Sequence, residues 1–224
     1  MTSDTTTRDL IIDTALKLAE ERPWTDVLLR DIAREAGIDL AAMQGVVSNK
    51  DAIIAAFIRR IDQQMLSESR DVSTDQSPRD ALFEVIMNRF DALAPHKPAL
   101  KSIVGPKLPD PDLLRAFLQS QGWILQAAGV DPVGLKGGVR VAGLLGLYST
   151  VFQTWLDDDD PGLARTMAVL DRRLRRGERV LKRADNVVDM AEGLCRTLYS
   201  MLPTRLQSKQ DGQPSSEPEL DTRT

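Results

Sequence analysis

Cysteine and histidine are nearly absent from this chain, which has one residue of each among its 224 residues. The lone Cys195 cannot close an internal disulfide, and one histidine with one cysteine cannot supply the ligands of a usual metal cluster. The sequence offers no plausible Ser/His/Asp set, no glycine-rich phosphate loop after a strand and no obvious pair of catalytic carboxylates. We therefore expect a protein that is not an enzyme and that carries neither metal nor cofactor.

Long apolar runs are also missing. No stretch of about 20 apolar residues occurs, so no membrane-spanning helix is expected. The opening residues MTSDTTTRDLII do not combine a basic region with a long apolar one, as a secretory signal does. Together with the single cysteine, these features predict a cytoplasmic protein. The net charge of −4 gives no general attraction to nucleic acid, so any DNA binding must depend on a local surface.

Apolar residues at helical spacing are present along most of the chain, and no strand-like alternation stands out. This pattern predicts an all-α protein with a small N-terminal head over residues 8–66 and a larger helical body over residues 77–202, which would bind a ligand and a partner subunit. Residues 1–7 and 203–224 are polar and are expected to be disordered.

Within the head, residues 28–47 have the spacing of a helix-turn-helix. Thr25 or Asp26 can cap the first of the two helices, which would run to about residue 36. Gly37 is suited to the left-handed backbone conformation that ends such a helix, and Asp39 can cap the short second helix. The second helix can then lie in the major groove of DNA.

The segment from Arg8 to Phe57 resembles the head of TetR-family transcriptional regulators. That family combines a first helix, an I-A-x-x-A-G-V-S turn, a short helix, S-K-E and a fourth helix, and the residues that match here are Ile32, Ala33, Ala36, Gly37, Ile38, Asn49, Lys50, Asp51 and Ile54. The resemblance covers about the first 65 residues. It implies a ligand-responsive transcriptional regulator that binds operator DNA as a homodimer and acts as a repressor.

The expected recognition helix departs from the family pattern, with Asp39, Ala42, Gln44, Gly45 and Val47 where the family usually has Ser, Thr or Ser, Tyr, His and Phe. Residues 1–64 hold eight basic and eleven acidic side chains, a net charge of −3. Because DNA affinity depends mostly on the neutralisation of phosphates by basic side chains, this charge is unfavourable for DNA binding.

Two interpretations of the head remain open. In one, the head binds DNA through Arg30, Arg34, Leu40, Ala42, Gln44, Asn49 and Lys50, with Gln44 reading a base edge. In the other, the head is a structural domain that has lost its DNA partner.

A second resemblance lies in the body. The segment that begins at Tyr148 is similar to the C-terminal region of the coenzyme Q biosynthesis accessory family, whose members share the TetR-like fold and bind lipid. The residues that carry it are Tyr148, the acidic residues before Pro161, Thr166, Val169, Leu170, Asp171, Arg173 and Leu174. The family's C-terminal membrane-binding helix is not evident here. This resemblance implies an alternative function: a non-catalytic lipid- or isoprenoid-binding accessory protein with a degenerate helix-turn-helix.

The body is expected to hold an almost wholly apolar pocket, lined by Ile86, Phe90, Leu118, Trp123 and Phe152, which suits a hydrophobic small molecule or a lipid. The TetR resemblance implies a homodimer joined by helices at 161–183 and 185–202, with Met190, Leu194, Leu198 and Met201 as candidate interface residues.

The predicted helix 161–183 is rich in arginine. Arg172, Arg176, Arg179 and Arg183 fall on one face. This face fits either an anionic partner, such as a lipid headgroup surface or DNA, or a simply solvated surface.

Overall fold

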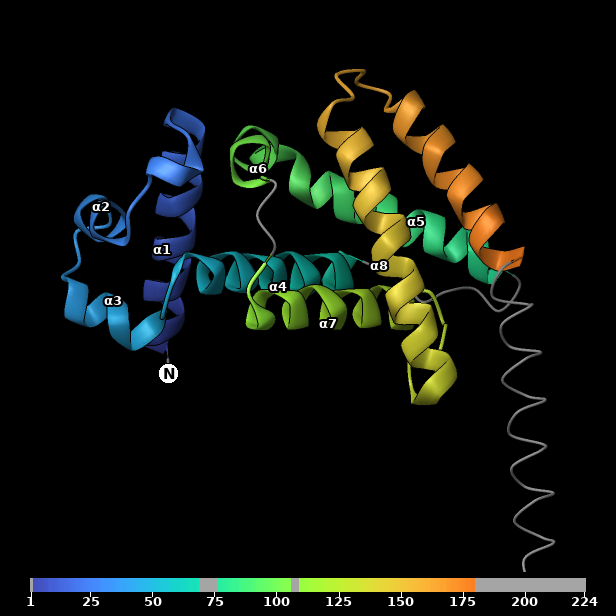
Figure 1. Cartoon of the computed structure of the whole chain (residues 1–224), viewed down its shortest axis with the longest axis horizontal. Coiled ribbons are helices and arrows are strands. Elements are labelled where there is room, and N and C mark those ends of the chain that lie inside the picture. Colours follow the sequence, from blue (N-terminus) through green and yellow to red (C-terminus); the bar gives the residue numbers. More distant parts are fainter. Residues whose placement is uncertain (1, 69–75, 106–108, 180–224) are drawn as a thin grey trace, which may run out of the picture. The chain divides into compact units, whose positions relative to one another are not determined.

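The computed structural model describes residues 2–68, 76–105 and 109–179, and throughout these ranges the regular structure is helical (Figure 1). Its labelled helices are α1 (Thr2–Glu21), η1 (Trp24–Asp26), α2 (Leu29–Glu35), α3 (Leu40–Val46), α4 (Lys50–Glu68), α5 (Pro78–Leu93), η2 (Ala94–His96), α6 (Lys97–Ile103), α7 (Pro111–Ala127) and α8 (Gly134–Leu156). A further helix, without a label in the figure, covers residues 164–179. The predicted all-α class is confirmed.

The described residues belong to the first of two compact units, Met1–Leu181. The second unit, Lys182–Thr224, lies outside the described residues. The predicted helix 185–202, its interface residues Met190, Leu194, Leu198 and Met201, and the predicted disordered tail therefore also lie outside them. No helix in the described part of the chain is long and apolar enough to cross a membrane.

Two helix starts differ from the sequence-based expectation. Helix α1 begins at Thr2 rather than at residue 8, because no proline or glycine interrupts the chain ahead of the periodic segment and a helix that has nucleated propagates readily. Helix α2 begins after Leu28, not at a Thr25 or Asp26 cap. The chain instead makes the short η1 turn and then extends through Val27, whose side chain is fully buried.

The turn between α2 and α3 follows the prediction. Gly37 has a φ of +68°, and two hydrogen bonds close the end of α2: the Gly37 N–H donates to the Arg34 carbonyl (3.2 Å) and the Ile38 N–H to the Ala33 carbonyl (3.0 Å). This pair of bonds is the Schellman arrangement. The Asp39 carboxylate then accepts the Ala42 N–H at 2.6 Å and caps α3. Local hydrogen bonding therefore fixes the geometry of the helix-turn-helix.

Helix α4 joins the head to the body. Its first half contributes Ile53, Ile54 and Phe57 to the buried core that includes α1, and the helix also packs on α5 and α7. Asn49 caps it by accepting the Ala52 N–H at 2.7 Å. Because one continuous helix contacts both regions, a displacement of its C-terminal half can be transmitted to the head.

Two helices of the body, α5 and α7, start at side-chain caps. Ser77 precedes Pro78 at the start of α5 and accepts the Asp80 N–H, and Asp110 precedes Pro111 at the start of α7 and accepts the Leu113 N–H. A proline in the first turn costs no hydrogen bond, because its missing N–H would have had no partner within the helix. Helix α8 packs on α7 and on α6.

Candidate functional site

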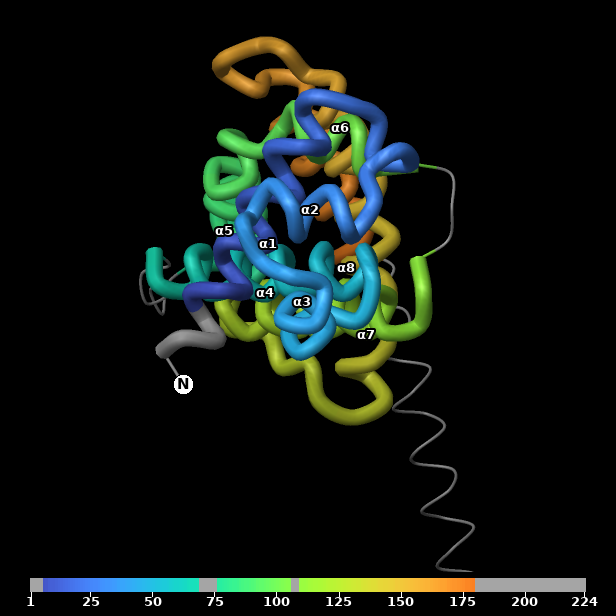
Figure 2. Tube along the Cα trace, turned by 90° about the vertical axis from the view of Figure 1, so that its left-hand side faces the viewer, coloured from blue at the N-terminus to red at the C-terminus, as the bar shows by residue number. Residues whose placement is uncertain are grey.

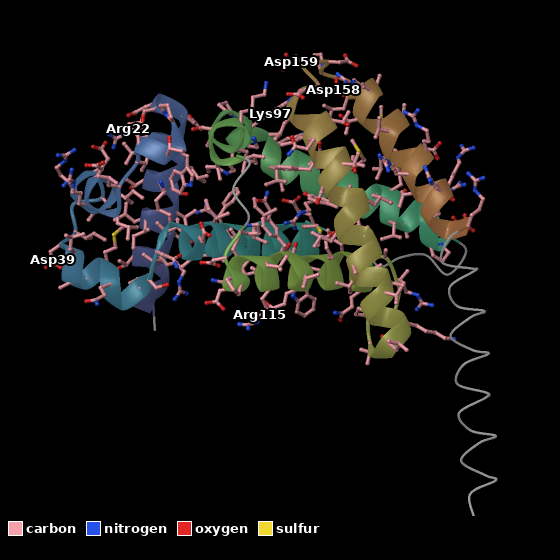
Figure 3. All side chains as sticks on the ribbon, viewed as in Figure 1. Arg22, Asp39, Lys97, Arg115, Asp158 and Asp159 are labelled. Carbon is pink, nitrogen blue, oxygen red and sulfur yellow. The ribbon has the colours of Figure 1, made fainter. Side chains whose placement is uncertain are left out.

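The outer side of α3 is available to a partner. Leu40 is 56% exposed, and Ala42 and Gln44 are also exposed, whereas Met43 is buried in the head core. Figure 2 looks at the molecule from the side on which α2 and α3 lie, and Figure 3 shows Asp39 at the outer end of α3. The residues Leu40, Ala42 and Gln44 are therefore presented outward, which is the geometry that groove recognition requires.

Two arginines of α2 accompany this face. Arg30 and Arg34 are both exposed, and the Arg34 guanidinium lies 3.5 Å from the Asp31 carboxylate while its side chain stays 80% exposed. Burial works against ionisation of Asp31, but the Leu28 N–H and the charges of Arg22 and Arg34 hold the pKa of Asp31 below its ordinary value. Such an exposed ion pair is weak, so a phosphate can compete for Arg34.

Lys50 and Asn49, which the sequence suggested as DNA contacts, have structural partners. The Lys50 ammonium donates to the backbone carbonyls of Trp24 and Val27, the latter at 2.8 Å, and lies 4.3 Å from the centre of the Trp24 ring. Besides capping α4, Asn49 donates from Nδ2 to the Asp110 carboxylate at 3.3 Å. Both side chains are engaged within the protein, and Arg30 and Arg34 are the exposed cations of α2 beside α3.

The head is also bonded to the body near its surface. The Ser102 hydroxyl of α6 accepts the Trp24 N–H at 2.9 Å and donates to the Arg22 carbonyl at 3.2 Å. At the start of α7, the Asp110 N–H donates to the Asp51 carboxylate at 3.2 Å. The position of the head is thus tied to α6 and α7.

A buried polar cluster lies where α4, α5, α7 and α8 meet. Arg89 of α5 forms an ion pair with Asp62 of α4 and donates from Nε to the Tyr148 hydroxyl of α8 at 3.0 Å. The Ser120 hydroxyl of α7 donates to the same Asp62 carboxylate at 2.8 Å. No member of the cluster is more than 9% exposed. The ion pair and its two hydrogen bonds therefore link side chains of four helices.

The charge of Arg89 is maintained despite burial. Desolvation alone would lower the pKa of Arg89, but Tyr148 and Asp62 more than offset it and the pKa is raised. Burial raises the pKa of the Tyr148 phenol, which stays neutral. Gln121, beside Ser120 on α7, is 1% exposed, and its Oε1 accepts no hydrogen bond. The cluster thus keeps a charged guanidinium in the interior of the body.

An aromatic stack adjoins this cluster. The Tyr148 ring lies 5.5 Å from Phe90 and 5.9 Å from Phe152, and Trp155 lies 5.3 Å from Phe90 and 5.6 Å from Phe152. Tyr148 therefore belongs both to the polar cluster and to a large apolar surface.

The predicted pocket residues are only partly brought together. Phe90 and Phe152 are in the aromatic stack, Ile86 is fully buried and Leu118 is partly buried. Trp123 of α7 is 47% exposed, and the pocket itself stays a prediction.

The sequence analysis missed the polar cluster, although one signal was present. Arg89 follows Val85 and Ile86 at helical spacing on an apolar stripe, and a charged residue on such a stripe is rarely buried without a partner. The identity of that partner, Asp62, is not readable from the spacing.

The residues that carry the second resemblance have structural roles in the body. The Asp158 carboxylate accepts the Thr166 N–H at 2.8 Å and the Thr166 hydroxyl at 2.6 Å, which closes the loop before the 164–179 helix. Leu170 and Leu174 of that helix are buried. Figure 3 shows Asp158 and Asp159 near Lys97 of α6, whose ammonium lies 4.0 Å from Asp159.

Replacing Thr166 with valine is expected to lower the free energy of unfolding by about 2 kcal/mol near neutral pH, because a buried hydrogen bond to a carboxylate is lost without a change of shape. The Thr166 hydroxyl is the main reason that the pKa of Asp158 lies below its ordinary value of 3.8. The stabilisation is fully present above that value and is lost as the pH falls through the lowered pKa. Urea denaturation at pH 7 and pH 3 measures both effects. An equal difference between wild type and variant at both pH values would contradict the assignment.

The arginine-rich face is exposed as far as the structure describes it. Arg172, Arg176 and Arg179 are exposed, and Arg183 lies outside the described residues. Arg175 pairs with Asp171 at 3.0 Å within the same helix.

Comparisons with known proteins bear on the fold. No family model and no curated protein matches the chain. A crystal structure of a TetR transcriptional regulator from Nitrosomonas europaea ATCC 19718 is similar, with 26% identity, a TM-score of 0.59, and coverage of 76% of this chain and 97% of that one. A TetR transcriptional regulator from Rhodococcus sp. RHA1 matches in fold, with 17% identity, a TM-score of 0.58, and coverage of 77% and 96%. The predicted resemblance to TetR-type regulators is confirmed.

Proposed function

Because this chain has the fold of TetR transcriptional regulators, we propose that it regulates transcription in the cytoplasm as a homodimer that binds operator DNA and releases it when a hydrophobic small molecule binds the body. In this proposal α3 enters the major groove, Gln44 bonds to a base edge, and Leu40 and Ala42 make apolar contacts. Arg30 and Arg34 bind the flanking phosphates. The protein then acts as a repressor.

The observation that carries this proposal is the outward presentation of α3 on a fully formed helix-turn-helix. The Schellman turn at Gly37 and the cap at Asp39 fix the angle between α2 and α3. The outer side of α3 is left uncovered by the rest of the described chain, with Leu40 56% exposed. The dimer follows from the same proposal, since two heads read the two halves of a palindromic site.

One observation favours the second candidate, a lipid-binding accessory protein without DNA-binding activity. The face of α3 has no basic side chain, and Lys50 is engaged by Trp24 and Val27. A protein of this kind would bind lipid in the body and leave DNA unbound at low salt.

A gel-shift titration against DNA fragments that flank the gene, repeated at several salt concentrations, tests the first candidate. The double variant R30A/R34A is expected to bind all sequences more weakly, by roughly 30-fold, and to lower the salt dependence by about two phosphate contacts. Q44A is expected to lose roughly tenfold in affinity for the specific site and little for unrelated DNA. The stoichiometry should be two chains for each site.

The matched control is R165A. Arg165 is also exposed, but it lies on the 164–179 helix and not on the face of α2 and α3. The regulator proposal is abandoned if no fragment binds at low salt, or if R30A/R34A binds as wild type does. Mass spectrometry of lipid that co-purifies with such a protein would then favour the second candidate.

A further inference from the structure

Helix α3 presents almost no hydrogen-bonding side chains on its outer side. Its exposed residues are Leu40, Ala41, Ala42, Gln44 and Gly45, and Leu40 is 56% exposed. Among these five, Gln44 alone has a side chain that forms hydrogen bonds. A groove that receives this helix therefore meets an apolar surface with a single amide.

This surface lacks the groups that most often recognise a guanine. An arginine or lysine that donates to O6 and N7 is the commonest such contact, and α3, with the sequence LAAMQGV, contains neither residue. Arg30 and Arg34 lie on α2, and the first helix of a helix-turn-helix crosses the DNA backbone instead of entering the groove. Lys50 donates to the carbonyls of Trp24 and Val27.

A carboxylate can identify the same base pair from the other strand, by accepting from N4 of cytosine. The candidate is Asp39 at the start of α3. Its carboxylate already accepts the Ala42 N–H at 2.6 Å as the cap of the helix, and its negative charge is repelled by the phosphates on both sides of the groove. The contacts that identify a G·C pair are therefore either absent from this face or opposed by charge.

The same surface matches an A·T pair. In the major groove thymine exposes its C5 methyl group, which binds apolar side chains, and adenine exposes N6 and N7, which bind an amide in bidentate fashion. Leu40, Ala41 and Ala42 supply the apolar contacts, and Gln44 supplies the amide. Residues 1–64 carry a net charge of −3, so phosphate neutralisation contributes less to affinity here and base contacts contribute more.

We propose that each operator half-site is an A·T sequence whose thymine methyl groups contact Leu40, Ala41 and Ala42 and whose adenine bonds to Gln44. The proposal rests on the proposed function and specifies the class of DNA sequence that this function recognises. Leu40 has the largest apolar side chain on the exposed face of α3, and it makes most of the methyl contacts.

Selection of bound duplexes from a random pool, with the full chain at low salt, identifies the preferred site. A·T pairs are expected at the most strongly selected positions of each half-site. Affinity is then compared between this duplex and one in which uracil replaces thymine in the half-sites, since uracil lacks the C5 methyl group. The replacement is expected to weaken binding about fourfold for each contacted methyl group. Uracil outside the half-sites is the control and is expected to leave affinity unchanged.

The uracil comparison also separates base reading from DNA shape. A-tracts have a narrow minor groove that some proteins select without contacting base edges. Such a preference does not depend on the C5 methyl group, which lies in the major groove. An A·T site whose affinity is unchanged by uracil would therefore refute the proposal.

Two variants assign the contacts to residues. L40S is expected to lose most of the difference between thymine and uracil, whereas L114S, which changes a leucine of α7 that is 42% exposed, is expected to keep it. Q44R introduces the side chain that reads guanine, and is expected to change the selected base at one position of each half-site from adenine to guanine.

The proposal is overturned if G·C pairs are selected throughout the half-sites, if L40S keeps the full difference between thymine and uracil, or if Q44R still selects adenine. Specific binding to a G·C site would contradict the A·T reading and leave the regulator function standing. Binding of no duplex at low salt would rule out the regulator function and the A·T reading together.

Discussion

Replacing Arg89 with methionine is expected to lower the free energy of unfolding by about 3–5 kcal/mol, because Asp62 is left buried with its charge uncompensated. Arg89 and Asp62 are 4% and 5% exposed, so water cannot replace the lost partner. The Tyr148 hydroxyl also loses the donor on Nε. Urea denaturation of the variant and wild type, followed by circular dichroism, measures the difference.

The double variant D62N/R89M separates the charge from the packing. It should recover most of the loss, since the isolated buried charge is gone while the amide oxygen of the introduced asparagine can still accept from Ser120. If R89M were as stable as wild type, the ion pair would not hold α4 to α5 in solution. A double variant as unstable as R89M would assign the cost to packing around the guanidinium instead.

Replacing Gly137 with alanine is expected to lower the free energy of unfolding by about 3 kcal/mol, at the upper end of what overpacking costs. A Cβ atom at this position would lie 2.1 Å from the carbonyl carbon and oxygen of Pro132. These are backbone atoms, so no side-chain rotation relieves the clash. Gly134 has a φ of +74° and turns the chain sharply into α8, which brings Pro132 over the first turn of the helix.

The neighbouring Gly138 provides the control, because nothing lies within 4 Å of a Cβ placed there. Alanine at this exposed helical position is expected to raise the free energy of unfolding by about 0.5–1 kcal/mol through its higher helix propensity. Thermal unfolding of both variants gives the comparison. The account of the turn fails if the two substitutions shift the midpoint in the same direction.

The sequence by itself determined the parts of this protein that depend on neighbours within one or two helical turns. The end of α2 at Gly37, the cap of α3 at Asp39 and the start of α5 after Ser77 are all set by hydrogen bonds that span three to five residues. Their donors and acceptors are close together in the sequence, so spacing and residue type suffice to predict them. The all-α class and the position of the helix-turn-helix follow from the same short-range periodicity.

Only the tertiary structure decided which polar side chains are available for binding. Lys50 has the sequence position of a phosphate contact, but its ammonium reaches carbonyls 23 and 26 residues earlier in the chain. Arg89 meets a carboxylate 27 residues away and a phenol 59 residues away. The physical reason is that a long side chain bonds to whatever the packing of distant helices places beside it, and helical periodicity gives the face of a residue without giving the helix that covers that face.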